Sequence, residues 1–379
     1  MLKKLGKILF SIFIFLILVA MGVYFFVLEY PNLTSNPKVD KMYQVTTSKM
    51  KDSEGGSYRA FFKKGKENKL LVYFAGGGVS INSEMAKDDT YNTKSVPVDY
   101  LANITMNMGG LASSIEKSPY KDWSIIMFPY ATGDFHSGRG EFKYIDTDGK
   151  EKILYHNGYI NYQETMNKIV KVSGIDNPDT VVVTGYSAGG FGAALLADDI
   201  FTNYFPHTVN KNVLIDASLL LHKDWKGIAT NVWNTPETIT NKMKTNNLTL
   251  DMLVALREKY GPEIKLLFDS STRDGDLAKV QNYFDTGIMD VSEKEADIYQ
   301  TILKETVAEF KKHDISSFIW DGVKWYDDPR NLTAHTIIST PLVWGPLEST
   351  KQSINQWLLD AINGQPKDYG LELLDKKYE

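Results

Sequence analysis

The sequence predicts an α/β fold: a doubly wound, mostly parallel β-sheet with helices on both faces, preceded by one transmembrane helix. Two observations predict it. Short apolar runs alternate with helical patterns downstream of residue 41, and these runs are continuous, as expected for parallel strands covered on both faces. The first 28 residues combine lysines with one long uncharged apolar run.

The N-terminal segment has the pattern of a membrane anchor. Lys3, Lys4 and Lys7 precede an uncharged run of 21 residues from Ile8 to Leu28. That length suffices for one helical span, and the positive flank predicts a cytoplasmic N-terminus and an extracytoplasmic C-terminal domain. Residues 1–28 are therefore expected to be a cytoplasmic stub and an anchor in the lipid bilayer. Cleavage of this segment as a signal peptide is the alternative, and it would give a secreted protein.

Composition restricts the setting and the partners. The 379-residue chain has no cysteine, so neither a lipoprotein cysteine nor a disulfide framework is available, which fits a bacterial surface protein. Of the net charge of −5, the three N-terminal lysines contribute +3, so the remainder carries −8. This acidic balance argues against a nucleic-acid partner. No motif requires a metal or a cofactor, and none indicates an oligomeric state.

After a polar, proline-containing stretch expected to be a stalk (29–41), the sequence predicts one α/β domain over 42–379. A long interval, 217–262, is expected to be an insertion over the active-site edge of the sheet. Six apolar runs are predicted to be the buried strands: Leu70–Ala75, Ser124–Phe128, Thr180–Thr184, Val213–Asp216, Ile264–Phe268 and Ser317–Trp320.

Two later helices are marked by capping boxes, in which a serine precedes a glutamate or glutamine by three residues. Ser292 with Glu295 precedes one apolar stripe, and Ser349 with Gln352 precedes another. Gly364 is the expected stop of the second helix.

A Gly-x-Ser-x-Gly pentapeptide, centred on Ser187, lies between an apolar strand pattern and a helix of small residues. In this setting a serine can be an exposed nucleophile on a sharp strand-to-helix turn. An inert serine in a tight turn is the alternative, so the pentapeptide needs support from other segments.

A run of glycines, Gly76 to Gly78, ends the early strand pattern and supplies such support. Acyl-transfer enzymes need backbone N–H donors aimed at a developing oxyanion. In α/β-hydrolases one donor follows the nucleophile, here Ala188, and another comes from a glycine-rich loop after an early strand, here Gly78 or Val79.

The base and the acid are sought after the serine, in the chain order Ser, Asp, His. His335 lies between the last predicted strand and the final helix, where the base belongs. The acid should follow the penultimate strand, where Asp269, Asp274 and Asp276 all lie, and Asp216 ends the strand before it. Spacing alone does not separate these aspartates.

Taken in order, five segments resemble the pectin acetylesterase and Notum-like family of α/β-hydrolases: "YFAGGGVS", "FPYATGDFHSGRG", "HNGYINYQETM", "TGYSAGGFGAAL" and "AHTI". The resemblance implies a serine carboxylesterase that removes acyl groups, often acetyl, from a carbohydrate or another O-acyl acceptor. Unlike the better-known members this chain lacks cysteine, and Val79 stands where a tryptophan often follows the glycines.

The resemblance also implies roles for individual residues. Ser187 matches the nucleophile, His335 the base and Asp274 the acid, with Asp276 as fallback, while Gly78, Val79 and Ala188 match the oxyanion donors. Asp134 and His136, in the "TGDFH" motif, match residues that lie beside the nucleophile in relatives, and are candidates for the substrate pocket; a structural role, with a buried Asp134 bracing a loop, is the alternative. Trp225 and Trp233 are further pocket candidates, because they lie in the 217–262 interval expected over the active-site edge, which is not part of the resemblance.

The sequence therefore predicts a membrane-anchored, extracytoplasmic serine esterase, with an O-acylated surface glycan as the substrate class favoured by family and location. A serine peptidase or amidase on the same fold is one alternative. A non-catalytic glycan-binding surface protein is another.

Overall fold

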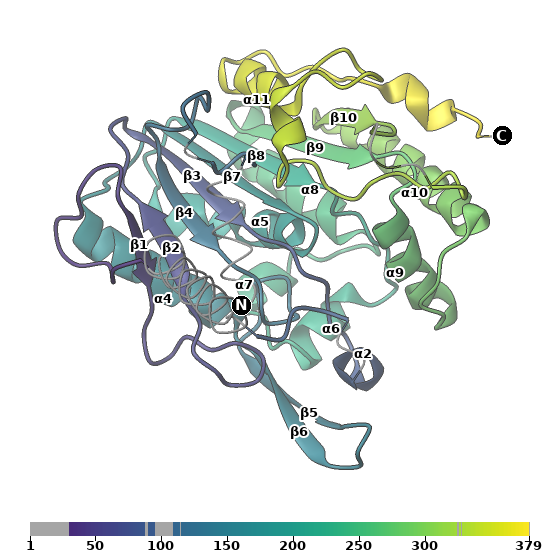
Figure 1. The fold of residues 1–379 in the computed structure, drawn as a ribbon, viewed down its shortest axis with the longest axis horizontal. Coiled ribbons are helices and arrows are strands. Elements are labelled where there is room, and N and C mark those ends of the chain that lie inside the picture. The colour runs from purple at the N-terminus through teal and green to yellow at the C-terminus, as the bar shows by residue number, and fades with distance from the viewer. Residues whose placement is uncertain are drawn as a thin grey trace, which may run out of the picture.

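The computed structural model describes residues 30–87, 90–94, 109–113, 115–323, 326 and 328–378. At its centre lies an eight-stranded sheet (Figure 1). Its strands are β1 (Met42–Val45), β2 (Ala60–Lys63), β3 (Lys69–Phe74), β4 (Ser124–Phe128), β7 (Thr180–Tyr186), β8 (Asn210–Asp216), β9 (Lys265–Ser271) and β10 (Ser316–Trp320).

The strand order is β1-β2-β4-β3-β7-β8-β9-β10. The strands from β4 to β10 pair in parallel, whereas β1 and β2 add an antiparallel edge. This confirms the predicted mostly parallel sheet, and all six predicted strands are present.

Four strands were not predicted. β1 and β2 have only four residues each, too few for a clear periodicity. The hairpin of β5 (Gly140–Ile145) and β6 (Glu151–His156) projects from the body of the molecule in Figure 1. Exposed residues alternate with half-buried ones along β5, and β6 begins with two exposed charged residues, so both strands lack the continuous apolar run that marks a buried strand.

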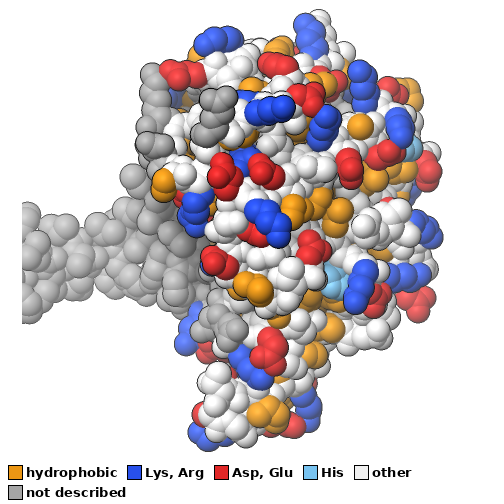
Figure 2. All heavy atoms as spheres, turned by 90° about the vertical axis from the view of Figure 1, so that its right-hand side faces the viewer, with side chains coloured by type: hydrophobic (Ala, Val, Ile, Leu, Met, Phe, Trp, Pro, Cys, Tyr) orange, Lys and Arg blue, Asp and Glu red, His pale blue; other side chains and the backbone are white. Residues whose placement is uncertain are grey.

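Helices cover both faces of the sheet, as predicted. On one face α4 (Gly158–Ser173), α5 (Ala188–Asp199), α8 (Leu248–Tyr260) and α10 (Glu293–Lys312) contribute to one large apolar cluster. On the other face α11 (Ile354–Ile362) and the segment 334–347 form a second cluster with the opposite side chains of the same strands. On the surface shown in Figure 2, acidic and basic side chains are interspersed.

One predicted capping box is confirmed and the other is wrong. Ser292 and Glu295 form the reciprocal hydrogen bonds of a capping box at the start of α10. The cap of α11 is Ser353, whose side chain accepts from Gln356 N. Lys351, at φ 55°, has a left-handed backbone that no α-helix can include, so the helix begins after it.

The interval 217–262 contains α6 (Trp225–Asn231), α7 (Glu237–Thr240) and α8. Because α8 connects the parallel strands β8 and β9 and packs against α5, it is a regular crossover helix of the sheet. Only the part before α8 is additional to the α/β alternation.

The residues expected to be a stalk lie along the sheet instead, as far as they are described. Leu33 N donates to Gln44 O at 2.8 Å, and Asp40 N donates to Lys64 O at 2.8 Å. Burial of the Leu33 side chain favours this docked position. Within the described ranges no helix is long and apolar enough to cross a membrane. The anchor predicted at residues 8–28 lies outside those ranges and stays a prediction.

Candidate active site

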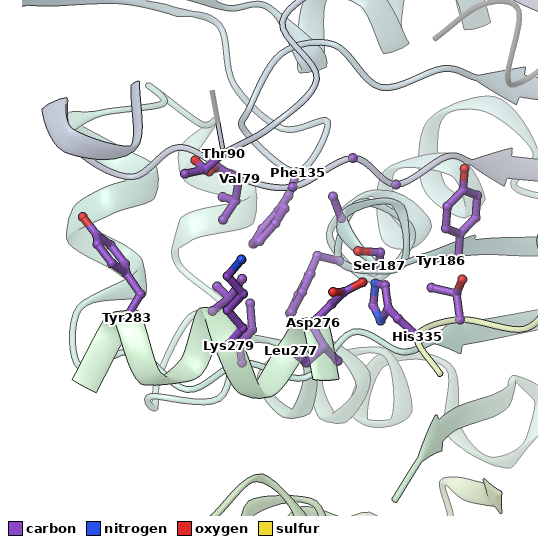
Figure 3. A pocket seen from close by; sticks show the side chains of 18 of the residues that line it. Val79, Thr90, Phe135, Tyr186, Ser187, Asp276, Leu277, Lys279, Tyr283 and His335 are labelled. Atoms are coloured by element: carbon purple, nitrogen blue, oxygen red, sulfur yellow. The ribbon is translucent and has the colours of Figure 1, made fainter. Parts of the chain in front are cut away.

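A cavity of about 590 Å³ lies beyond the carboxyl ends of β3 and β7, where ligands bind in open α/β sheets. Figure 3 shows it between the glycine loop and α9 (Gly275–Thr286). Its lining includes the predicted nucleophile, the predicted base, the glycine loop and many apolar side chains. The complete lining is Gly76, Gly77, Gly78, Val79, Met85, Thr90, Phe135, Tyr186, Ser187, Ala188, Phe191, Leu220, Asp276, Leu277, Lys279, Val280, Tyr283, Met289, His335 and Thr336.

Ser187 occupies a strained turn between β7 and α5. Its backbone has φ 53° and ψ −129°, outside the regions that side-chain-bearing residues favour. The turn is held because Ser187 N donates to Asp216 O at 2.9 Å. A Cβ on Gly189 would lie 2.1 Å from Phe74 O, so a glycine is needed there for the helix to approach β3. This is the strand-turn-helix setting of a nucleophile elbow.

Backbone donors converge on the same end of the cavity. Ala188 is the first residue of α5, so its N–H has no acceptor within the helix and lies at the positive end of the helix dipole. The glycine loop lines the cavity beside it. Gly78 has φ 84°, and a Cβ there would lie 2.0 Å from Thr90 O, so the loop conformation requires glycine.

His335 and Asp274 are hydrogen-bonded, with 2.7 Å between Nδ1 of the imidazole and Oδ2 of the carboxylate. Asp274 caps α9, and its other oxygen, Oδ1, accepts from Asp276 N and Leu277 N. An ionised carboxylate can only accept a hydrogen bond, so the neighbouring Nδ1 carries the proton of the neutral imidazole. Nε2 is then unprotonated and can act as a base. Figure 3 shows His335 and Ser187 at the same end of the cavity.

The charges around His335 favour the imidazolium form. Burial by itself would lower the pKa of His335, but Asp274, aided by Asp276 and Asp216, raises that pKa to about 9. Burial raises the pKa of Asp274, while His335 and the N–H of Leu277 act in the opposite direction. The arrangement stabilises a positive charge on the imidazole when it takes up a proton.

The other aspartates considered as the acid lie elsewhere. Asp276 is exposed on the cavity wall. Asp269 lies within β9, buried, with its Oδ1 accepting from Trp320 Nε1 at 3.3 Å. Asp216 ends β8, and its Oδ2 accepts from Ile337 N and Ile338 N, both at 2.9 Å. Among these residues Asp274 alone is hydrogen-bonded to His335 in the described part of the chain.

Of the two roles considered for the "TGDFH" residues, the structure supports the structural one, since neither Asp134 nor His136 lines the cavity. Asp134 is fully buried, and its carboxylate accepts from Thr132 Oγ1, Gly138 N and Gly158 N. Burial raises the pKa of Asp134 to about 7, although these hydrogen bonds oppose the shift. His136 Nε2 is 2.9 Å from Ala75 O, and burial lowers its pKa to about 4.

The two tryptophans expected at the pocket are also core residues. Trp233 Nε1 donates to Ser80 O at 2.8 Å, and Trp225 Nε1 donates to Leu220 O at 3.2 Å. Both rings lie close to Phe135, which itself lines the cavity. Their burial comes from this aromatic cluster, which the sequence pattern does not reveal.

Several cavity residues were not predicted, above all those of α9. Lys279 and Tyr283 line the cavity one helical turn apart, with Leu277 and Val280 beside them. Figure 3 shows the Lys279 side chain reaching into the middle of the cavity and Tyr283 at the end away from His335. The Asp274-Gly275-Asp276 sequence could have predicted the start of this helix, because aspartate is a favoured N-cap residue.

The family model for pectinacetylesterase matches residues 50–260, which is more than half of the chain. The chain belongs to the pectinacetylesterase family. It is accordingly a carboxylic-ester hydrolase. The matched region contains the glycine loop, the "TGDFH" motif and the serine turn, and it ends before Asp274 and His335.

Among solved structures, the chain is similar to the Wnt deacylase Notum from Drosophila, with a TM-score of 0.58 and 15% sequence identity over 85% of this chain and 93% of that one. At this identity the likeness shows a shared fold. No curated protein matches the sequence. Within the described residues, no group of three or more His, Cys, Asp or Glu side chains could hold a metal ion.

Proposed function

We propose that this pectinacetylesterase-family protein is a serine carboxylesterase that removes acyl groups from an O-acylated glycan outside the membrane. The observation that carries the proposal is the 2.7 Å hydrogen bond of His335 Nδ1 with Asp274 Oδ2, at a cavity that both His335 and Ser187 line. This hydrogen bond supports His335 as a general base, because it leaves Nε2 of the imidazole available to take the proton of Ser187.

The reaction follows from this arrangement. His335 Nε2 takes the proton of Ser187 Oγ as the oxygen attacks the ester carbonyl, and the N–H groups of Ala188 and the Gly78–Val79 turn stabilise the oxyanion. The imidazolium then protonates the departing alcohol, which leaves an acyl-enzyme. Water, losing a proton to His335, attacks this intermediate and releases the acid and free Ser187. Asp274 orients the imidazole and stabilises its charged form.

The nucleophile is tested with a fluorophosphonate probe, which modifies activated serines. We expect labelling of the wild type, loss of labelling in Ser187→Ala, and retained labelling in Ser137→Ala, a buried serine that does not line the cavity. No labelling of the wild type, or equal labelling after Ser187→Ala, would contradict the proposal.

The acid is tested by paired amide substitutions. Asp274→Asn should lower kcat by on the order of 10⁴, the size of effect found when a triad carboxylate becomes an amide. Asp276→Asn, on the exposed wall, should retain activity within about threefold, since it makes no hydrogen bond with the base. The reverse order would assign the acid to Asp276.

The substrate is tested by comparing esters and amides on one acceptor. Hydrolysis of aryl acetates without hydrolysis of the matching anilides would support an esterase over a peptidase or amidase. Release of acetate from an acetylated glycan, measured against aryl esters of longer acids, would then define the acyl group that the cavity accepts. A folded protein that binds glycans but cleaves none of these esters would support the non-catalytic alternative.

A further inference from the structure

Two buried carboxyl groups lie side by side behind the candidate triad, on the neighbouring strands β8 and β9. Asp216 and Asp269 are opposite each other in the parallel register, and neither side chain is exposed. Two neighbouring carboxyl groups in a buried site cannot both ionise without strong repulsion, and a hydrogen bond between them requires that one of them is protonated.

The remaining hydrogen bonds indicate where the proton lies. Within the described residues no donor reaches Asp216 Oδ1 or Asp269 Oδ2, although both atoms are buried. One proton between the two carboxyl groups would satisfy both orphaned oxygens. Among the described residues, Asp216 Oδ2 accepts from two backbone N–H groups, whereas Asp269 Oδ1 accepts a single hydrogen bond, of 3.3 Å, from Trp320 Nε1. The charge is therefore better stabilised on Asp216, and Asp269 is the acid that keeps the proton.

Asp216 contacts both halves of the candidate catalytic machinery. Its backbone carbonyl accepts from Ser187 N at 2.9 Å. Its carboxylate accepts from Ile337 N and Ile338 N, two and three residues after His335. Asp216 thus fixes the serine turn and the histidine segment to the same strand end.

We infer that Asp216 and Asp269 form a one-proton carboxyl pair that positions the His335 segment and places a second negative charge behind the imidazole. Asp216 is a positioning residue, because it acts through His335 and Ser187. The inference rests on the proposed function for its kinetic consequences, but the shared proton does not depend on it.

The electrostatic surroundings agree with this assignment. Burial and the neighbouring Asp216 charge raise the pKa of Asp269 well above its usual value. Burial also raises the pKa of Asp216, to about 6, but the N–H groups of Ile337 and Ile338 act against the shift. In the described part of the chain, the titratable groups that face Asp216 also include the phenols of Tyr73 and Tyr186 and the imidazole of His335.

The shared proton is tested by infrared spectroscopy of the full chain. At neutral pH the difference spectrum between wild type and Asp269→Asn should contain the carbonyl band of one carboxylic acid. The bands of other buried carboxyl groups, such as Asp134, cancel in this subtraction. Absence of that band would overturn the pair, whether or not the protein cleaves esters.

The positioning role is tested with two amide variants that differ only in which partner changes. Asn at 269 can donate to Asp216 as the protonated acid does, so Asp269→Asn should keep kcat/KM within about threefold and leave its pH midpoint unchanged. Asp216→Asn removes the charge behind His335, so kcat/KM should fall by on the order of tenfold or more and its pH midpoint should move down.

Equal losses in the two variants, or an unchanged midpoint in Asp216→Asn, would overturn the positioning role. If Asp216→Asn does not fold, the kinetics of Asp269→Asn and the infrared band still decide, because a tenfold loss in Asp269→Asn contradicts the assigned proton. A wild type without esterase activity would refute the proposed function and leave the band as the test of the pair.

Discussion

The protonation state of His335 determines when the proposed nucleophile can be activated. A general base must be neutral, and the pKa of His335 is raised to about 9, chiefly because Asp274 outweighs the effect of burial. The fraction of neutral imidazole therefore increases with pH and reaches one half at that value. We expect kcat/KM of the free enzyme to rise with pH and reach half its maximum near pH 9.

The measurement is the pH profile of ester hydrolysis, with the rate in Ser187→Ala subtracted at each pH to remove alkaline hydrolysis. In Asp274→Asn the residual activity should have a lower midpoint, because the charge that raises the pKa of His335 is gone. A midpoint that is the same in both proteins would show that the titrating group is not His335.

Asp134 illustrates a motif residue whose role is to hold the fold. Asp134→Ala would leave the donors on Thr132, Gly138 and Gly158 without their acceptor in a buried site. Each unsatisfied buried donor costs about 1–3 kcal/mol, so we expect a loss of at least 3 kcal/mol in the free energy of unfolding.

Urea unfolding measures this loss, and Asp148→Ala in the exposed hairpin turn is the control, with an expected change of about 0.5 kcal/mol or less. Fluorophosphonate labelling per folded molecule should be unchanged in Asp134→Ala. A stable variant with lost labelling would instead indicate a direct role in the site.

At the scale of elements, the loop after β3 depends on a backbone conformation that only glycine accommodates. Gly78 and Gly149 both have positive φ, 84° and 78°, but they differ in their surroundings. A Cβ at Gly78 would lie 2.0 Å from Thr90 O, whereas a Cβ at Gly149, in the β5–β6 hairpin, would meet nothing within 4 Å.

The two glycines therefore make a matched pair of substitutions. Gly149→Ala should cost about 1–2 kcal/mol of stability and no activity, since it adds only the strain of the left-handed backbone. Gly78→Ala must also displace the loop, so we expect kcat to fall by on the order of 10², as after loss of an oxyanion donor. Steady-state kinetics on folded protein would contradict the oxyanion role if Gly78→Ala were as active as Gly149→Ala.

Helix α9 places a cation inside a largely apolar cavity. Lys279 lines the cavity, and within the described residues no carboxylate forms an ion pair with it. A cation there favours substrates with a negative charge near the ester. We expect Lys279→Met to raise KM severalfold for esters that carry a carboxylate, and to leave KM for neutral esters unchanged.

The control for this change is Lys294→Met, at the start of α10, where the side chain is 81% exposed. It alters the net charge equally but does not line the cavity. Equal effects of both substitutions on KM would indicate long-range attraction, and no effect of Lys279→Met on charged esters would exclude a role in substrate selection.

For the whole molecule, the sequence predicts the elements whose signals are local. Continuous apolar runs reveal the six parallel strands, and the order of Ser187 and His335 along the chain follows from that topology. Contacts between distant segments have no such signal. Asp216 meets residues 337 and 338 only through the fold, and the burial of Trp225 and Trp233 depends on their packing around Phe135. The choice of Asp274 as the candidate acid came from family resemblance and not from spacing, because Asp269, Asp274 and Asp276 share one short segment.

The predicted N-terminal anchor has a physical test in the full chain. The uncharged run from Ile8 to Leu28 would span about 30 Å as a helix, which matches the hydrocarbon core of a bilayer. We expect the chain to sediment with membranes, resist extraction by alkaline carbonate and dissolve in detergent. Because a charged residue at the centre of a span costs about 2.5–3.5 kcal/mol, the double substitution Phe15→Lys with Leu18→Lys should release the protein from membranes. A matched double substitution at the surface, Lys294→Met with Lys304→Met, should not change fractionation.

Protease added to intact cells should digest the catalytic domain, since the lysines before the run predict a cytoplasmic N-terminus. Recovery of a shortened, active chain from the medium would instead identify residues 1–28 as a cleaved signal peptide.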